Sequence, residues 1–489
     1  YTLWHTLSLH DALPISPDAF IYREPGKERK NMRKLKTDVL VIGSGMGGLS
    51  AAALLARGGY RVFVMEKLSR IGGRCSTLEI DGYCCTSGVL AVEVNGIVSR
   101  FFEEVNAPFD VQPAGALTCL IKSEAFQVPR KSGLKALLEA TDAGQDAVEK
   151  VMSAMSKALN WREPSPGISL YDWIRQYTKH PDIMQVFQVI VKAALMVNVE
   201  EVSARYFFSF AKTLEGGNEF GYCSKGSAAL PEALGQVVMQ QGGDIWTEAT
   251  VTRILSDHGV VQGVLLKQGE RDYKIEAQVV ISDTGPKKTV ELVGQQKFDK
   301  DYLEELEEKL KPTAVVCLQV GLEKPLFAQN HLLLVGSRRV HAVYQPSVIN
   351  PDLAPKGKHL LIANSIPKSL KSLTSEKGRQ AEIEACLADL KAVFPAFEKS
   401  AAILMTGVYR DYWPGMHAWP GKDMPIKTPI INLYNVGDGV KQGEYSGLPA
   451  VVKTGMMVAD EIRDRKSVFN GDQTHAAFYG MQQDHHLER

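Results

Sequence analysis

The sequence predicts an α/β protein in which segments from both ends of the chain build one parallel sheet. From Thr37 the chain reads as an apolar strand, a glycine cluster, a small-residue helix and a second apolar strand. A helix over 230–240 and three apolar runs within 250–282 predict a return to this sheet that ends in a strand meander. A last strand near 431–436, followed by a glycine-rich loop and a helix, completes the pattern.

The segments between these units predict a second, α+β domain interleaved with the first. Helical spacing is present over 135–159 and 182–197, and the charged stretch at 303–311 is typical of a solvated helix face. The chain leaves and re-enters the sheet without a low-complexity linker. The expected boundaries are 37–95, 226–289 and 401–464 for the sheet domain, 96–225 and 290–400 for the second domain, and 465–489 for a loosely held polar tail.

Composition excludes several classes of protein. Lys plus Arg and Asp plus Glu each total 56, so no net charge favours nucleic acid. The seven cysteines lack metal-type spacing and indicate free thiols in a reducing, cytoplasmic compartment, and no metal site is expected. No apolar run is long enough to span a bilayer. Residues 1–31 lack a secretory pattern and resemble translated adapter sequence, so we expect the natural start at Met32.

A glycine-rich turn after the first strand predicts a site for the pyrophosphate of a dinucleotide. Gly43, Gly45 and Gly48, with Met46 inside the turn, form a G-x-G-x-x-G pattern between an apolar strand and a helix. The first glycine permits the turn, the second lets backbone N–H groups approach the phosphates, and the third lets helix and strand pack closely. Glu66 ends the second strand and can accept hydrogen bonds from the adenosine ribose. Lys67, which follows it, is expected at the same site.

The segment after this acid bears on the cofactor, because FAD and NAD share the adenosine half. The sequence Gly72-Gly73-Arg74 resembles the second signature of the FAD-dependent amine oxidases and phytoene desaturases. In that family the glycines let the chain bend over the cofactor, and the arginine lies beside its phosphates or its flavin. The resemblance therefore implies that these three residues contact FAD.

A motif near the carboxyl end, NLYNVGDGVKQGEYSGLPAVVKTG, resembles the carboxy-terminal FAD signature of the same family. The resemblance implies that Asp438 lies near the ribityl and diphosphate groups, with Gly437 and Gly439 allowing close approach. The helix that begins near Gly447 and Leu448 would direct its positive end toward the flavin pyrimidine ring. A helix amino terminus placed there stabilises the anionic reduced flavin.

Within this superfamily the chain is most similar to the branch of phytoene desaturase, carotenoid isomerase and retinol saturase. The stretches KGSAALPEAL and SDTGP carry this similarity, as does the strand around Val251, whose backbone is expected to meet the adenine. The resemblance implies a Rossmann-like FAD-binding domain, made of a parallel sheet and a β-meander, with an interleaved substrate domain. Monoamine oxidases attach flavin through a cysteine in the terminal loop, and 442–447 contains none, so non-covalent FAD is expected.

Hydride transfer to a flavin needs no side-chain nucleophile, and the catalytic residues stay unassigned. Asp411, His417 and Glu444 are candidates for a general acid or base, because they lie in the segment that should border the flavin. Three aromatic residues could flank an amine, although packing is the favoured explanation for each; these are Trp413, Trp419 and Tyr445.

These observations predict an FAD-dependent oxidoreductase that acts by hydride transfer on a long, apolar, polyunsaturated or isoprenoid substrate of the carotenoid or retinoid type. Desaturation, saturation and isomerisation all stay open. The alternatives are a flavin amine oxidase acting on a soluble amine, and a non-catalytic flavin-bound subunit. An apolar substrate would reach a deep tunnel from a bilayer, so peripheral contact with the inner face of a membrane is expected. The sequence does not indicate the electron donor or acceptor.

Overall fold

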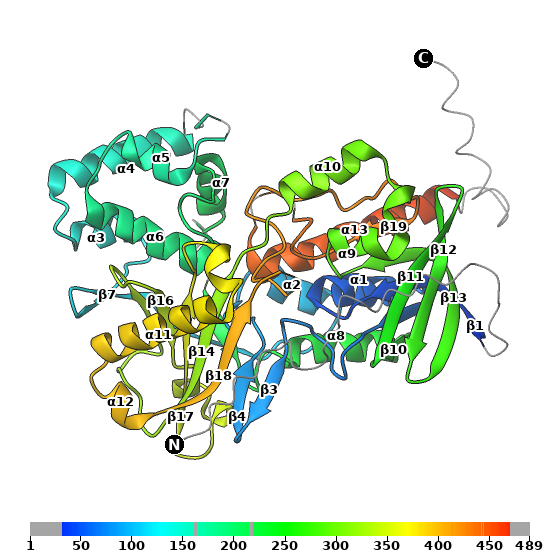
Figure 1. Cartoon of the computed structure of the whole chain (residues 1–489), viewed down its shortest axis with the longest axis horizontal. Coiled ribbons are helices and arrows are strands. Elements are labelled where there is room, and N and C mark those ends of the chain that lie inside the picture. Colours follow the sequence, from blue (N-terminus) through cyan, green and yellow to red (C-terminus); the bar gives the residue numbers. More distant parts are fainter. Residues whose placement is uncertain are drawn as a thin grey trace.

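One seven-stranded sheet gathers strands from both ends of the chain (Figure 1). The computed structural model describes residues 32–469 apart from 161–163, 166, 215–218, 412, 442 and 444. The strand order is β10-β2-β1-β13-β12-β11, with β19 also paired to β13. The bounds are β1 Arg33–Ile42, β2 Val62–Met65, β10 Asp244–Trp246, β11 Ala249–Asp257, β12 Val260–Gln268, β13 Arg271–Ser282 and β19 Leu433–Asn435.

The pairing directions confirm the predicted parallel sheet with its meander. β1 runs parallel to β2 and β13, β2 to β10, and β13 to β19. β11, β12 and β13 are antiparallel to one another. Residues 39–42 of β1 are all buried, as expected of a strand with both faces covered.

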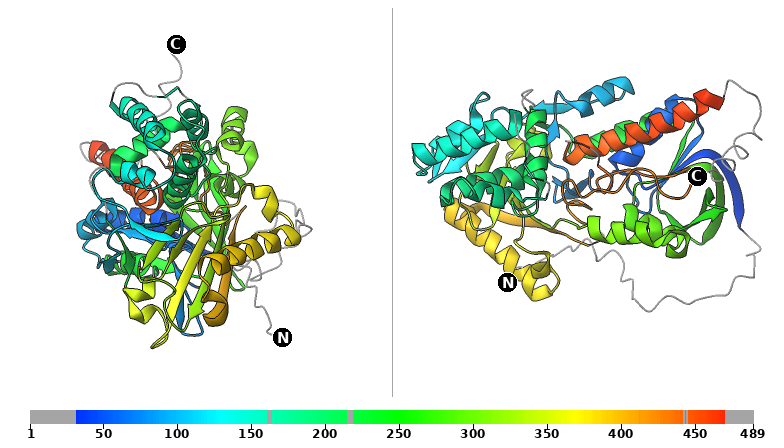
Figure 2. Two further views of the ribbon diagram at one scale, coloured as in Figure 1. Left: turned by 90° about the vertical axis from the view of Figure 1, so that its left-hand side faces the viewer. Right: turned by 90° about the horizontal axis from the view of Figure 1, so that it is seen from above.

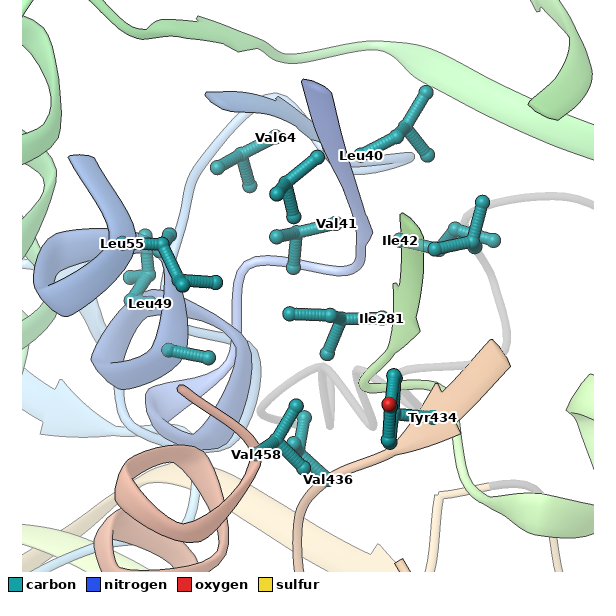
Figure 3. Packing of buried hydrophobic residues seen from close by; sticks show 14 of the residues in the cluster. Leu40, Val41, Ile42, Leu49, Leu55, Val64, Ile281, Tyr434, Val436 and Val458 are labelled. Atoms are coloured by element: carbon teal, nitrogen blue, oxygen red, sulfur yellow. The ribbon is translucent and has the colours of Figure 1, made fainter. Parts of the chain in front are cut away.

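Helix α1 (Met46–Arg57) is held against this sheet by small side chains. Every residue from Met46 to Ala56 is buried, and the helix packs against α8 (Ala229–Gln240) and α13 (Gly447–Phe469). A Cβ atom at Gly455 of α13 would lie 2.6 Å from the carbonyl oxygen of Gly47, so glycine allows the two helices to touch. Figure 3 shows Ile281 of β13 between Val41 of β1 and the side chains of Tyr434, Val436 and Val458, with Leu49 and Leu55 of α1 to one side.

A second seven-stranded sheet, β18-β14-β17-β16-β15-β7-β8, forms the core of the other half. All eight residues of β14 are buried, because α11 covers one face and a separate apolar cluster covers the other. The bounds are β7 Thr118–Ile121, β8 Glu124–Gln127, β14 Val315–Leu322, β15 His331–Leu334, β16 Val340–Tyr344, β17 His359–Ser365, β18 Ala401–Tyr409, α11 Glu376–Val393 and α12 Phe397–Ser400.

A group of helices packs at the end of the second sheet, and Figure 2 shows it at the extremity farthest from the meander. Its members are α3 Gly133–Glu139, α4 Gln145–Asn160, α5 Leu170–Arg175, α6 Pro181–Leu195 and α7 Ala204–Leu214. The remaining elements are β3 Thr77–Ile80, β4 Tyr83–Thr86, β5 Val92–Glu93, β6 Val111–Pro113, β9 Phe220–Cys223, α2 Ile97–Glu104, α9 Pro286–Val293, α10 Lys300–Lys309 and four short 3-10 turns at 295–297, 346–348, 351–353 and 370–373. Within the described part of the chain, no helix combines the length and the apolar character that a membrane crossing requires.

The packing redistributes several segments relative to the expected boundaries. α2 and α10 fall in segments assigned to the second domain, but their apolar side chains join the core of the first sheet. β18 falls in the segment assigned to the first sheet, yet it pairs with β14 in the second. The helix expected over 135–159 is two helices, interrupted before Gly144, whose φ is +76°. The helix expected to end near 464 continues to Phe469, which shortens the predicted loose tail.

Candidate functional site

The glycine-rich turn joins the carboxyl end of β1 to the amino end of α1, as the sequence predicts. Gly43 has a φ of +92°, which favours glycine, and its N–H donates to the carbonyl oxygen of Met65 at 2.8 Å. The same edge carries the end of β13, because the N–H of Asp283 donates to the carbonyl oxygen of Ile42 at 2.8 Å. Three strand ends therefore meet at the turn, at the edge where open parallel sheets bind ligands.

Each glycine of the turn is required by a different neighbour. A Cβ atom at Gly48 would lie 2.7 Å from the carbonyl oxygen of Gly43, which supports its predicted role in helix–strand packing. At Gly47 it would lie 2.9 Å from the backbone nitrogen of Gly437. At Gly45 it would collide with Oδ2 of Asp283. The prediction gave the diphosphate as the reason for glycine at position 45, and the structure adds a carboxyl group of the protein itself.

Glu66 lies directly after β2, as the sequence predicts. Its side chain is buried, with an exposed fraction of 5%. Its Oε2 accepts hydrogen bonds from the Ser44 backbone N–H at 3.0 Å and the Ser44 hydroxyl at 2.6 Å, and its Oε1 accepts from the Leu68 N–H at 2.8 Å. The carboxylate thereby links the glycine turn to the chain after β2. Lys67 beside it is exposed to solvent.

The start of β11 lies beside Glu66, because the Ala249 N–H donates to the carbonyl oxygen of Glu66 at 2.8 Å. Val251 follows two residues later and is buried in the core of the first sheet. Val251 and Glu66 therefore lie close enough to contact the adenine and the ribose of one dinucleotide. Both contacts remain predictions.

The Gly72-Gly73-Arg74 segment folds onto the glycine turn. The Gly72 N–H donates to the carbonyl oxygen of Ser44 at 2.9 Å, and Gly72 forms a parallel bridge with Gly45. Gly72 and Gly73 have φ values of +100° and +57°, so both need the freedom of glycine. The chain thus bends across the turn and carries Arg74 to the carboxy-terminal loop.

Arg74, Asp438 and His417 form one compact cluster in the site. The Arg74 guanidinium donates to Oδ2 and Oδ1 of Asp438 at 2.7 and 3.0 Å. The His417 ring Nδ1 lies 2.6 Å from Oδ1 of the same carboxylate. Arg74 also donates to the backbone carbonyl oxygens of residues 414 and 415.

This cluster fixes the charge of Asp438. Burial alone would raise the pKa of Asp438, but the neighbouring Arg74 and His417 hold that pKa well below its usual range. Burial alone would lower the pKa of Arg74, and Asp438 raises it above its ordinary value. Asp438 is therefore an anion that is already paired with Arg74 and His417. The sequence predicts a contact between Asp438 and a cofactor, but not these two partners.

The carboxy-terminal loop and α13 pack directly against the glycine turn and α1. The Gly437 N–H donates to Oγ1 of Thr454 on α13 at 2.8 Å, which ties the loop to the helix. Gly447, with a φ of +59°, begins α13, and Leu448 beside it is buried. Gly439 allows close packing, since a Cβ atom there would lie 2.8 Å from Pro286.

The candidate acids and bases divide into one inside the cluster and one outside it. His417 belongs to the cluster through Asp438. Asp411 forms an ion pair with Arg410, and 40% of its side chain is exposed, which is typical of a surface residue. Glu444 lies outside the described residues. Trp413 is partly buried, with no hydrogen-bond partner for its Nε1 among the described residues, while Trp419 and Tyr445 contact the cations of Lys311 and Lys453.

Sequence reasoning missed Asp283 and the second role of His417. The signal that could have indicated Asp283 is an acid directly after a predicted strand, in the SDTGP stretch. The contact between His417 and Asp438 could not be predicted from their spacing in the sequence, because the segment between them is mostly irregular.

Comparison with known proteins decides the family. Residues 46–463 match the family described as flavin-containing amine oxidoreductases. The chain belongs to this family. It is 25% identical over 410 residues to an uncharacterised protein of Methanocaldococcus jannaschii, covering 82% of this chain and 93% of the relative. It is also 27% identical to a phytoene desaturase of Cercospora nicotianae, covering 50% of this chain and 44% of the relative, and 24% identical to a prolycopene isomerase of an Oncidium hybrid cultivar, covering 87% and 83%.

Solved structures agree with this assignment. An oxidoreductase from Methanosarcina mazei has a TM-score of 0.78 and 27% identity, covering 87% of this chain and all of that one. A putrescine oxidase bound to putrescine has a TM-score of 0.65 at 17% identity, covering 88% and 100%, and shares the fold. The chain is thus a flavin-dependent oxidoreductase in the superfamily that also includes the phytoene desaturases.

The residues of the site fit a flavin dinucleotide. The glycine turn, Gly72 and the Gly437 loop form a cradle in which close neighbours exclude side chains, and Gly73 beside them has a φ of +57°. Two buried polar atoms near Arg74 lack partners among the described residues, the Tyr409 hydroxyl and the Trp413 Nε1. The residues that would hold the diphosphate and ribose are Gly43, Gly45, Met46, Gly48, Glu66, Gly72, Gly73, Arg74, Gly437 and Asp438.

Proposed function

We propose that this chain binds one FAD without a covalent bond and uses it to transfer hydride to or from a long apolar, isoprenoid-type substrate. The single observation that carries the proposal is the meeting of three glycine-rich segments with the Arg74–Asp438–His417 cluster at one sheet edge. Arg74 supplies a cation beside the cradle, and we expect the amino end of α13, which begins at Gly447, to face the flavin. A flavin bound there supplies the hydride chemistry.

The protein's own groups would orient and tune this centre. Asp438 holds the Arg74 guanidinium in place through two hydrogen bonds, so the cation keeps a fixed direction. The same carboxylate holds the His417 ring through its Nδ1 atom. Glu66 and Ser44 fix the turn on the adenosine side. No covalent link to the protein is needed for any of these contacts.

An apolar wall beside Arg74 supports a hydrocarbon substrate. One apolar cluster includes Val315, Ile362, Met405 and Tyr409 from the second sheet, with Trp413 packed against it. Tyr409 is close enough to Arg74 to affect its pKa. The relatives named phytoene desaturase and prolycopene isomerase act, by their names, on carotenoid-type molecules. We therefore place the substrate tunnel between this cluster and the flavin.

Peripheral contact with a membrane is part of the proposal. Leu117 and Phe220 are among the exposed large apolar side chains, at 41% and 44%. Both lie on neighbouring segments, because the Ala114 N–H donates to the carbonyl oxygen of Phe220. An apolar substrate held in a cytoplasmic leaflet could enter on this side.

The cofactor part is tested by colour and release. The purified protein should be yellow, and acid or heat should release intact FAD into the supernatant. Flavin that stays with the precipitate would overturn the non-covalent attachment, and release of FMN alone would overturn the dinucleotide.

The substrate part is tested by anaerobic flavin reduction and by extraction of lipid from fresh protein. Isoprenoid found by mass spectrometry, with no bleaching by simple amines, is the expected result. Putrescine oxidase shares the fold, so an amine oxidase is the second candidate. Rapid bleaching by amines with peroxide release would establish it, and a flavin that no tested compound reduces would favour a non-catalytic subunit.

A further inference from the structure

The carboxyl group of Asp283 lies inside the cradle that the glycine residues form. Its Oδ1 would lie 3.1 Å from a Cβ atom at Gly47 and 2.9 Å from one at Gly437, and its Oδ2 would collide with one at Gly45. Asp283 follows β13 directly, and its backbone is anchored to Ile42 of β1. The side chain is therefore placed between the amino end of α1 and the carboxy-terminal loop.

The surroundings of this carboxyl group provide no dedicated counter-ion. Asp283 as a residue is only partly buried, but its Oδ2 atom is shielded from solvent and lacks a hydrogen-bond partner among the described residues. The Gly48 N–H faces the carboxyl group and favours its charged form. Arg74 is nearby, but its guanidinium is bound to Asp438.

The other charged groups around Asp283 oppose its ionisation. Asp438 on the carboxy-terminal loop and Glu66 at the end of β2 are both acids, and His417 is engaged with Asp438. Burial, the largest cause, together with these two acids raises the pKa of Asp283 to about 8. At neutral pH the side chain is a neutral carboxylic acid in the ligand-free protein.

We propose that Asp283 is a cofactor-positioning residue whose carboxyl group belongs to the dinucleotide site, and that a negative charge on this group opposes binding of the diphosphate. This inference rests on the proposed FAD binding. A diphosphate placed at the glycine turn brings further negative charge to the same cradle. That charge makes ionisation of Asp283 harder still, so binding of FAD and protonation of Asp283 support each other.

The direction of the pH dependence follows from this coupling. Below the ligand-free pKa the acid is already protonated, and the affinity for FAD should not depend on it. Above that pKa, binding must first add a proton, so the dissociation constant should rise by up to about tenfold per pH unit. The rise ends where the pKa of the FAD-bound protein is reached.

The test measures the dissociation constant of FAD between pH 6.5 and 9.5, by quenching of free-FAD fluorescence on the full chain stripped of cofactor. Wild type should bind more weakly above about pH 8. Asp283→Asn should remove most of this dependence, because the amide keeps the shape and cannot ionise. Asp257→Asn, an exposed carboxylate on β11, is the matched control and should behave as wild type.

A second measurement needs no variant. Titration calorimetry of wild type with FAD at pH 8.5, in two buffers of different ionisation enthalpy, should show proton uptake on binding. A pH-independent affinity, a parallel rise in wild type and Asp283→Asn, or zero proton uptake would each overturn the role of Asp283 while leaving FAD binding intact. Failure of wild type to bind FAD at any pH would overturn the proposed cofactor and this inference with it.

Discussion

Arg74 and Asp438, which are 364 positions apart in the chain, meet through two hydrogen bonds of 2.7 and 3.0 Å at the edge of the first sheet. Their side chains are 25% and 6% exposed, so the pair is shielded on the Asp438 side. The contact joins the segment after β2 to the loop before α13. We therefore expect cofactor binding and the integrity of the fold to depend on the same ion pair.

Asp438→Ala should therefore cost both stability and cofactor. The change leaves the Arg74 cation without its carboxylate and His417 without its acceptor, for a loss of about 1–3 kcal/mol in the free energy of unfolding. FAD retention after dialysis should fall at the same time. Thermal melting with flavin absorbance measures both. Asp411→Ala, which breaks the more exposed pair with Arg410, is the control and should change stability by less than about 1 kcal/mol. Equal effects of the two variants would contradict the central role of Asp438.

Gly45→Ala should destabilise the protein even before cofactor is considered. The new methyl group collides with the Asp283 carboxyl group, and overpacking of this kind costs about 1–3 kcal/mol. Combining it with Asp283→Gly should restore the melting temperature. If FAD binding also returns, the collision with Asp283 is the whole reason for glycine at position 45; if only stability returns, the diphosphate needs the space as well. Unrelieved instability in the double variant would show that the collision with Asp283 does not account for the loss of stability.

Glu66→Ala should weaken FAD binding by about 10- to 100-fold, since a hydrogen bond to a charged group is worth about 1.5–3 kcal/mol. Part of the loss comes through Ser44, which donates two hydrogen bonds to this carboxylate. Fluorescence titration with FAD measures it. Glu79→Ala, on the exposed strand β3, is the matched control. Undiminished affinity in Glu66→Ala would place the ribose elsewhere.

Acid should destabilise the second sheet through His341. Burial lowers the pKa of this histidine to about 3, with a smaller contribution from Lys192, and its Nδ1 has no partner among the described residues. In the unfolded chain His341 takes up a proton near pH 6.5. The free energy of unfolding is therefore unaffected by this group above that pH, and it falls by up to about 1.4 kcal/mol per pH unit as the pH drops toward 3. His341→Leu should flatten this loss.

Urea unfolding at pH 7 and pH 5 compares the two proteins. His258→Leu, whose side chain is 94% exposed, serves as the control and should keep the wild-type slope. An unchanged slope in His341→Leu would mean that another group takes up the proton.

The sequence predicted the elements of the first sheet well, because strand, turn and helix signals there are local. The G-x-G-x-x-G turn, Glu66 and the loop at Gly437 all lie where the pattern placed them. Contacts between distant loops were beyond it: nothing local in the sequence signals that Asp438 shares its charge with Arg74 and His417. Domain boundaries were also hard to place, because α2 and α10 are ordinary amphipathic helices whose apolar faces could pack against either sheet.

The late position of β19 and α13 in the chain affects how the protein is made. Val280 of β13 pairs with Leu433 of β19, and α13 covers the small-residue face of α1. Such long-range closure is slow compared with local folding. When β1, α1 and the meander have been synthesised, the side of α1 that α13 later covers is still exposed. It stays exposed until β19 and α13 have also been synthesised. Cofactor capture is consequently a step that follows synthesis of nearly the whole polypeptide, and chaperone protection before that step should decide the yield of active protein.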